Sequence, residues 1–311
     1  MDIFDTKGIK PMLIAEMKEP FNDKNYIYEL KLDGIRCVAY MDKDSVDLRN
    51  KRDFKLLPRF PELKGLNKLV NEKCILDGEL LVTDREGKPD FYEMQRRTTL
   101  TNNFKINLAC KANPASYVVY DIIYLKDKLV NDLELIERKR LLQSVITNEN
   151  SKFATSRYIE EKGIELFELS RQQSLEGVVA KKKDSKYWFN KRSKDWIKFK
   201  VMNDDDFVIC GYIFKPNNMA SLILAKYNKN NELQITNHVS LGVSITKLKQ
   251  NGMTQSSCPL NTIPKGYNNA VWIEPMVCTV EYMPSNTEGL RQPVFKGIRV
   301  DKLPNECRIY V

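Results

Sequence analysis

The chain has 311 residues, 42% of them hydrophobic and 29% charged, a balance typical of a folded globular protein long enough for two domains. It contains no run of about 18 apolar residues and no apolar stretch of a secretory signal at its start, so we expect a cytoplasmic, intracellular protein without a membrane partner. The seven cysteines form no C-x-x-C pair and indicate reduced thiols, and the single histidine, His238, excludes a zinc site with paired histidines.

In chain order, the first two thirds of the sequence mix strand and helix patterns. Residues 26–40, 75–83 and 116–124 are apolar or alternate as strands do. Helical spacing follows at 133–146 and 164–171, and strands return at 177–180 and 196–201. Because these elements do not follow a strict βαβ rhythm, we expect an α+β fold of antiparallel sheets with helices and not a Rossmann arrangement.

The polar, acidic run at 203–206 predicts a domain boundary, which divides the chain into residues 1–202 and 203–311. Beyond it, short strands are expected at 207–214, 221–227, 232–237, 271–282 and 294–300. Short strands separated by polar turns are typical of a small β-barrel, and an OB-fold is the leading candidate.

Basic residues gather between residues 181 and 200, with aromatic residues among them, in a chain whose formal net charge is +9. This segment predicts contact with nucleic acid or with nucleotide phosphates. A solvated, solubilising face is the alternative, because most charge runs have that role. Within the segment, we assign the consecutive Lys181, Lys182 and Lys183 to DNA binding.

Several short motifs carry residue types suited to covalent nucleotide chemistry. Lys31 follows a strand-like run and precedes Asp33 and Gly34, which makes it a candidate nucleophile, although this pattern also describes surface turns. Each motif alone has an ordinary structural explanation, but coincidence explains the ordered set poorly. The motifs are Lys31-Leu32-Asp33-Gly34-Ile35-Arg36, Leu48-Arg49-Asn50, Asp77-Gly78-Glu79, Tyr120-Asp121, Glu176-Gly177-Val178-Val179, Lys198-Phe199-Lys200 and Arg299-Val300-Asp301-Lys302.

Over essentially the whole chain, this ordered set resembles the ATP-dependent DNA ligases of the covalent nucleotidyltransferase superfamily, above all small bacterial and phage-encoded enzymes with a catalytic core and an OB domain. The resemblance implies an adenylyltransferase (ATP-grasp-like) domain followed by an OB-fold. It also implies an enzyme of DNA replication, repair and recombination that seals nicks with a 3′-hydroxyl and a 5′-phosphate in duplex DNA. ATP would be the co-substrate, and Mg²⁺ or Mn²⁺ would be the metal ion. The protein would be a monomer.

In such an enzyme, Lys31 would attack the α-phosphorus of ATP to form lysyl-AMP and release pyrophosphate. Only the neutral amine is nucleophilic, so a metal ion and the nearby cations Arg36, Lys198 and Lys200 are expected to lower the pKa of Lys31. Glu29 lies two residues earlier on the same strand face. We expect it to accept a hydrogen bond from the adenine amine, which favours ATP over GTP.

The resemblance implies roles for the remaining motif residues. Tyr120 would stack on adenine, Glu79 and Arg49 would contact ribose or phosphate, and Glu176, with Glu79, would hold the metal. In the barrel, Arg299 and Lys302 would orient the pyrophosphate when the domain closes over the nucleotide. The expected catalytic residues are Lys31, Asp33, Lys198 and Lys200, and the expected nucleotide-binding residues are Glu29, Lys31, Arg36, Arg49, Glu79, Tyr120, Glu176, Lys198, Lys200, Arg299 and Lys302.

Two alternatives stay open. An RNA ligase would share the first step, because these motifs do not specify the sugar of the substrate. A non-catalytic nucleic-acid-binding module could keep the fold, although the intact set of Lys31, Glu79, Glu176, Lys198 and Lys200 argues against it.

Overall fold

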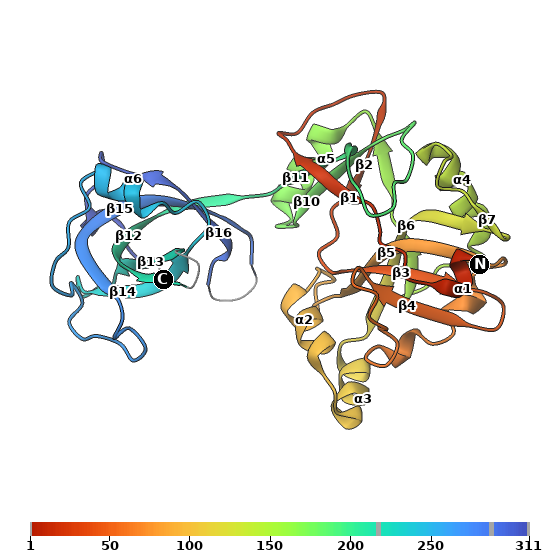
Figure 1. Ribbon diagram of the computed structural model, residues 1–311, viewed down its shortest axis with the longest axis horizontal. Helices are drawn as coiled ribbons and strands as arrows, with labels where there is room; N and C mark the ends of the chain where they lie inside the picture. Colours follow the sequence, from red (N-terminus) through yellow and green to blue (C-terminus); the bar gives the residue numbers. More distant parts are fainter. Residues whose placement is uncertain (1, 216–218, 286–288, 310–311) are drawn as a thin grey trace. The chain divides into compact units, whose positions relative to one another are not determined.

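The computed structural model of the protein describes residues 2–215, 219–285 and 289–309. The chain forms two compact units, Met1–Val201 and Met202–Val311 (Figure 1). Each unit is built on mainly antiparallel sheets accompanied by helices. The expected α+β class is therefore confirmed.

The first unit contains two sheets, of which the first has the strand order β1-β11-β10-β2-β9. Its strands are β1 (Leu13–Met17), β2 (Tyr26–Leu30), β9 (Tyr158–Glu160), β10 (Gly177–Lys182) and β11 (Arg192–Lys200). β1 runs parallel to β11, and the other neighbours are antiparallel. Val179 of β10 lies opposite Glu29 of β2 on one side and opposite Lys198 of β11 on the other. The sheet thus unites three motifs that are far apart in the sequence.

The second sheet has the order β4-β3-β5-β6-β7, and β8 pairs with β6. Its strands are β3 (Ile35–Met41), β4 (Val46–Asn50), β5 (Cys74–Val82), β6 (Ala115–Leu125), β7 (Lys128–Leu129) and β8 (Phe153–Thr155). Arg36 of β3 lies opposite Glu79 of β5. Two of the expected site residues therefore share a register position on neighbouring strands.

A buried apolar layer joins the two sheets. Ile27, Val179 and Trp196 of the first sheet pack in one cluster with Val38 and Tyr120 of the second. Another cluster, which includes residues of α2 (Phe91–Thr99) and α4 (Leu135–Val145), packs on the other face of the second sheet. The helix α5 (Gly163–Gln172) lies on the first sheet beside β10 (Figure 1). Further elements of this unit are α1 (Ile3–Thr6), α3 (Asn103–Ala112), η1 (Pro61–Leu63) and η2 (Leu66–Leu69).

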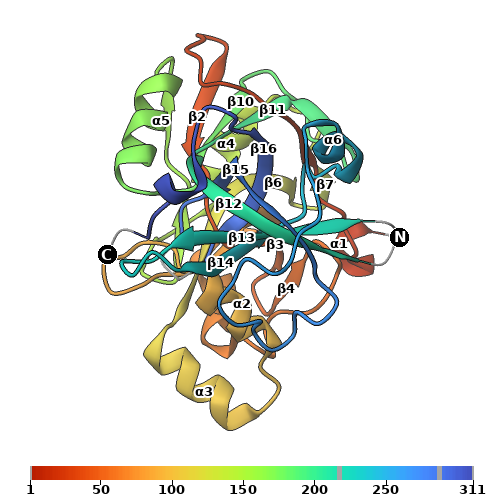
Figure 2. The same cartoon turned by 90° about the vertical axis from the view of Figure 1, so that its left-hand side faces the viewer.

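The second unit is a curled five-stranded antiparallel sheet of order β14-β13-β12-β15-β16 (Figure 2). Just after β14, Leu241 forms a β-bridge to Val294 of β16, so the two edges of the sheet approach each other. A sheet that returns to its own edge is a barrel, as expected of an OB-fold. Its elements are β12 (Asn203–Phe214), β13 (Ala220–Tyr227), β14 (Leu233–Val239), α6 (Ile245–Gln250), β15 (Val271–Met283), β16 (Arg291–Ile298) and η4 (Pro304–Glu306).

The acidic run at 203–206 is not a loop: these residues begin β12 and pair with Thr279–Tyr282 of β15. Acidic residues are tolerated in this strand because their charges are compensated. Lys226 of β13 pairs with Asp205, and Lys302 pairs with Asp206. The pattern of the sequence also does not predict α2 and α3, whose first turns are capped by the side chains of Asp90 and Asn102.

Candidate active site

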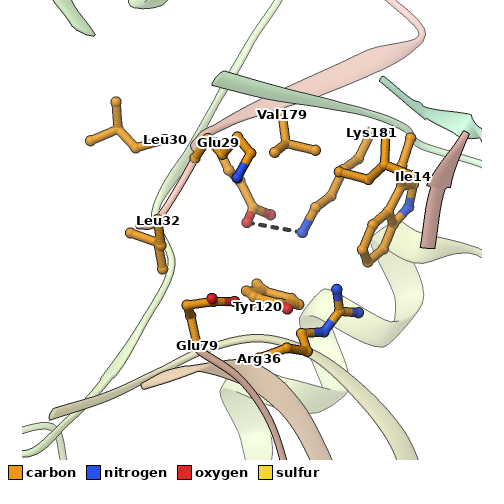
Figure 3. Close-up of a pocket in the computed structure, with 11 residues that line it drawn as sticks. Ile14, Glu29, Leu30, Leu32, Arg36, Glu79, Tyr120, Val179 and Lys181 are labelled. Carbon is orange, nitrogen blue, oxygen red and sulfur yellow. Dashed lines mark hydrogen bonds and ion pairs between the residues drawn. The ribbon is translucent and has the colours of Figure 1, made fainter. Parts of the chain in front are cut away.

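A pocket opens between the two sheets of the first unit, and strands of both contribute its walls (Figure 3). Five of the expected nucleotide-binding residues line it, namely Glu29, Lys31, Arg36, Glu79 and Tyr120. The other lining residues are Ile14, Leu30, Leu32, Val179, Lys181 and Trp196.

The segment between β2 and β3 presents the candidate nucleophile. The Lys31 N–H donates to the Gly177 carbonyl at 2.8 Å, which ties this segment to the start of β10. A Cβ at Gly34 would lie 2.0 Å from the Leu80 carbonyl oxygen, and a Cβ at Gly177 would lie equally close to a carbonyl of β11. Gly177 also has a φ of +134°. Both glycines therefore permit the close backbone contacts that place Lys31 at the pocket. Asp33, two residues later, is not part of the pocket lining.

A carboxylate lies directly against the amine of Lys31. Glu176 Oε2 accepts from Lys31 Nζ at 2.8 Å, and Lys200 Nζ lies 3.9 Å from Glu176 Oε1. The side chain of Glu176 is buried, and Lys198 lies two residues before Lys200 on β11. Of the cations expected around Lys31, Lys200 lies at the other oxygen of Glu176, so this carboxylate stands between the two lysines. Attack on ATP requires the amine to lose its proton.

Glu29 is buried in a cluster of donors. Its Oε2 accepts from Lys181 Nζ at 3.0 Å and from Ser156 Oγ at 2.8 Å, and its Oε1 forms an ion pair with Lys139 of α4. Burial would raise the pKa of Glu29, but Lys139 and Lys181 outweigh it and hold that pKa below its ordinary value. Glu29 therefore carries its negative charge inside the protein.

Lys181 lines this pocket. The sequence analysis assigns it to DNA binding, but its side chain is too deeply buried for that role. It is 2% exposed, and its ammonium lies 4.4 Å from the centre of the Tyr120 ring and 4.2 Å from that of Trp196. Burial lowers the pKa of Lys181 to about 8. Its neighbours Lys182 and Lys183 pair with Asp184 and Glu160. Lys181 is buried because side chains alternate between the two faces of a strand, and Lys181 shares the inward face of β10 with Val179.

Arg36 is held rigidly at the pocket wall. Its Nε and Nη2 donate to the two oxygens of Asp77 at 2.6 and 2.5 Å, and Tyr187 donates to the same carboxylate at 2.6 Å. The guanidinium also lies 5.0 Å from the centre of the Tyr120 ring. A bidentate pair of this kind fixes both the position and the plane of the guanidinium. Arg36 therefore presents a permanent positive charge beside the aromatic ring.

Glu79 is the carboxylate whose charge is least compensated in the pocket. Burial, with nearby Glu176 adding to it, raises the pKa of Glu79 to about 8 although Arg36 and Lys31 act in the opposite direction. Mg²⁺ and Mn²⁺ prefer oxygen ligands, and Mg²⁺ commonly binds through one or two carboxylates together with substrate phosphates. Glu79 and Glu176 fit such an ion, since a bound cation would relieve the unfavourable charge on Glu79.

We expect Glu79→Gln to flatten the pH dependence of stability. The carboxyl titrates near 4.5 when unfolded and near 8 when folded. Between these values the folded state binds the extra proton, so the stability of the natural protein falls as pH rises. The measurement is Tm at several pH values from 5 to 8, with the exposed Glu19→Gln as control. A slope in Glu79→Gln as steep as in the control would contradict the assignment.

Seven expected residues are absent from the pocket lining, namely Asp33, Arg49, Glu176, Lys198, Lys200, Arg299 and Lys302. Three of them have ion-pair partners away from the pocket. Arg49 is on β4, where its guanidinium donates to Asp47 at 3.0 Å and to Asp53 at 2.8 Å. Arg299 and Lys302 belong to the second unit, and each forms an ion pair with Asp206, at 3.1 and 2.9 Å. Their roles toward ATP therefore stay predictions.

Sequence reasoning does not find Lys181, Trp196, Lys139 and Ser156 as site residues. For Lys181 and Trp196 a usable signal exists, because strand alternation places them on the faces of Val179 and Lys198. For Lys139 there is no local signal, since its partner Glu29 lies on a distant strand.

Comparison with protein families decides the reaction class. Residues 11–200 match the ATP dependent DNA ligase domain, and residues 215–302 match the ATP dependent DNA ligase C terminal region. The chain belongs to the ATP-dependent DNA ligase family. It is thus an enzyme that forms phosphodiester bonds with ATP as co-substrate and a divalent metal, and the two alternatives of the sequence analysis are not favoured.

Two relatives extend this match. The ligase is 30% identical over 298 residues to the SPbeta prophage-derived DNA ligase-like protein LigB of Bacillus subtilis (strain 168), which covers 94% of this chain and 99% of that protein. It is also 30% identical over 314 residues to the multifunctional non-homologous end joining protein LigD of Pseudomonas aeruginosa. That match covers 96% of this chain and 36% of LigD, so the ligase corresponds to about a third of that relative.

Solved structures share the fold. Mycobacterial DNA ligase D complexed with ATP and MES aligns with a TM-score of 0.58 at 24% identity and covers 99% of both chains. A Lig E DNA ligase, titled as binding DNA with a minimal scaffold, aligns with a TM-score of 0.62 at 16% identity over 94% of this chain and all of that one. In the described part of the ligase, no helix has the length and apolarity to cross a membrane.

Proposed function

We propose that this ligase seals nicks with a 3′-hydroxyl and a 5′-phosphate in duplex DNA through a covalent AMP adduct on Lys31. The Lys31 nitrogen bonds to the α-phosphorus of ATP as the bond to pyrophosphate breaks. AMP then passes to the 5′-phosphate of the nick, and the 3′-hydroxyl displaces it. The released AMP and the new phosphodiester bond complete the cycle.

The observation that carries this assignment is the difference between the two lysines that line the pocket. Lys181 is held by Glu29 between two aromatic rings and is almost wholly buried. The side chain of Lys31 is 21% exposed and donates to Glu176 at the pocket. Lys31 is therefore the lysine free to reach a phosphorus atom, and Glu176 is the adjacent acceptor for the proton it loses.

The rest of the pocket suits an adenine nucleotide. Tyr120 and Glu29 both line the pocket. Tyr120 is proposed to stack on adenine, and Glu29 to accept a hydrogen bond from the adenine amine. Arg36, Lys198 and Lys200 are the cations proposed to bind the phosphates. Asp33, two residues after Lys31, is proposed as a further catalytic residue. Mg²⁺ or Mn²⁺ held by Glu79 and Glu176 would neutralise phosphate charge during transfer.

The partner proposed is nicked duplex DNA, bound by a monomer in the cytoplasm during replication, repair or recombination. The net charge of +9 supports a polyanionic partner. The seven cysteines are all free thiols, which suits a reducing compartment.

The test is incubation with α-labelled ATP and Mg²⁺, followed by sealing assays on matched DNA and RNA nicks. We expect a covalent protein–AMP band, loss of that band with EDTA, and sealing of the DNA nick at least about tenfold faster than the RNA nick. Faster sealing of the RNA nick would favour the RNA-ligase alternative. Binding of DNA without any label transfer would favour a non-catalytic module.

A further inference from the structure

Lys139 is a buried cation in α4 with no role in the reaction as described so far. It is 4% exposed, and its ammonium pairs with Oε1 of Glu29 in β2. Lys139 is absent from the pocket lining and instead lines a separate cavity with Ser156 and Tyr158. It therefore reaches the nucleotide pocket only through Glu29.

The acceptor positions of Glu29 explain why this pair matters. A carboxylate offers about four lone-pair positions, two on each oxygen. Lys181 and Ser156 occupy both positions of Oε2. Oε1 faces Lys139 and accepts no other hydrogen bond in the described part of the chain. Oε1 therefore has one acceptor position that no donor of the described residues occupies.

We propose that Lys139 is a positioning residue for base selection, which fixes the Glu29 carboxylate so that Oε1 presents its single open acceptor position to the purine amine. The proposal rests on the proposed role of Glu29 in binding ATP. Lys139 itself does not touch the nucleotide.

The physical reason is the cost of a buried charge. Glu29 is 2% exposed, and without Lys139 its carboxylate keeps only Lys181 as a cationic partner. It would then turn toward Lys181 and Ser156 or take up a proton. A protonated carboxyl can donate to the O6 acceptor of guanine, which an ionised one repels. Loss of Lys139 should therefore weaken ATP binding and admit GTP.

The experiment is self-adenylation kinetics of Lys139→Met with ATP and with GTP. We expect the KM for ATP to rise about tenfold while kcat changes less than about threefold, the scale of one weakened hydrogen bond. The preference for ATP over GTP should fall by at least about tenfold. Sealing of a pre-adenylated nick should not change. The matched control is Arg140→Met, which removes a neighbouring exposed cation of the same helix.

A double-mutant cycle with Glu29→Gln separates positioning from a purely structural role. Lys139→Met should have no further effect on the KM for ATP in the Glu29→Gln background. The proposal would be overturned if Lys139→Met raised the KM for ATP equally with and without Glu29→Gln. It would also be overturned if Lys139→Met slowed adenylation and the sealing of a pre-adenylated nick equally. If Lys139→Met does not fold, Lys139→Gln keeps a donor for Glu29 without the charge. An ATP preference in Lys139→Gln equal to that of the natural protein would overturn it as well.

The proposal and the proposed function fail in different ways. Absence of label transfer in the unsubstituted protein would refute the function of Lys31. Normal label transfer together with unchanged nucleotide preference in Lys139→Met would refute the role of Lys139 alone.

Discussion

Lys31→Ala should abolish self-adenylation, with transfer of label from ATP reduced by on the order of 10⁴-fold or more, as for other removed nucleophiles. Alanine leaves nothing to bond to the α-phosphorus, and the other pocket lysine, Lys181, is buried and paired with Glu29. Sealing of a nick that already carries AMP should persist at a reduced rate, because that step needs metal and positioning but no lysyl-AMP. Gel assays of protein labelling and of pre-adenylated nick sealing check both expectations.

Two variants serve as controls for this result. Lys31→Arg keeps a positive charge beside Glu176 but cannot form the same adduct, so it should also fail to take label. Lys24→Ala removes an exposed lysine just before β2 and should label normally. Persistent labelling of Lys31→Ala would place the nucleophile elsewhere.

Replacing both Arg299 and Lys302 by alanine should reduce self-adenylation by about 10²-fold. We propose that the two units close over ATP in the first step, which would bring these charges to the departing pyrophosphate. In the barrel, Asp206 pairs with both side chains and so keeps them together just after β16. Sealing of a pre-adenylated nick releases no pyrophosphate and should fall by less than about threefold.

The matched control is Lys247→Ala with Lys249→Ala, which removes two exposed cations from α6 of the same unit. If Arg299 and Lys302 act only through general attraction to DNA, both double variants should lower the two steps equally. Adenylation rates and pre-adenylated sealing rates are therefore measured side by side at one salt concentration, because phosphate contacts are salt-dependent. Equal losses in both steps would refute closure over pyrophosphate.

The elements that carry the motifs could be predicted from the sequence because their signals are local. The apolar alternation before Lys31 and Gly34 predicts the strand–turn–strand that the structure contains as β2 and β3. Likewise, the predicted helix at 133–146 corresponds to α4 and the predicted short strands of the barrel to β12–β16. The sequence analysis does not recognise α2, which is amphipathic but short, or α3, whose apolar residues do not gather on one face.

The sequence by itself determined the family, the order of the motifs and the strand face on which Glu29 precedes Lys31. Only the tertiary structure decided which charges meet. Glu176 contacts Lys31 directly, and Glu29 is paired with Lys139 of α4 and Lys181 of β10. The chain has 50 lysines and arginines, and strand alternation states the face of a residue but not its partner. Partners of buried charges are set by the packing of distant elements, because each buried carboxylate must find a cation wherever the fold brings one.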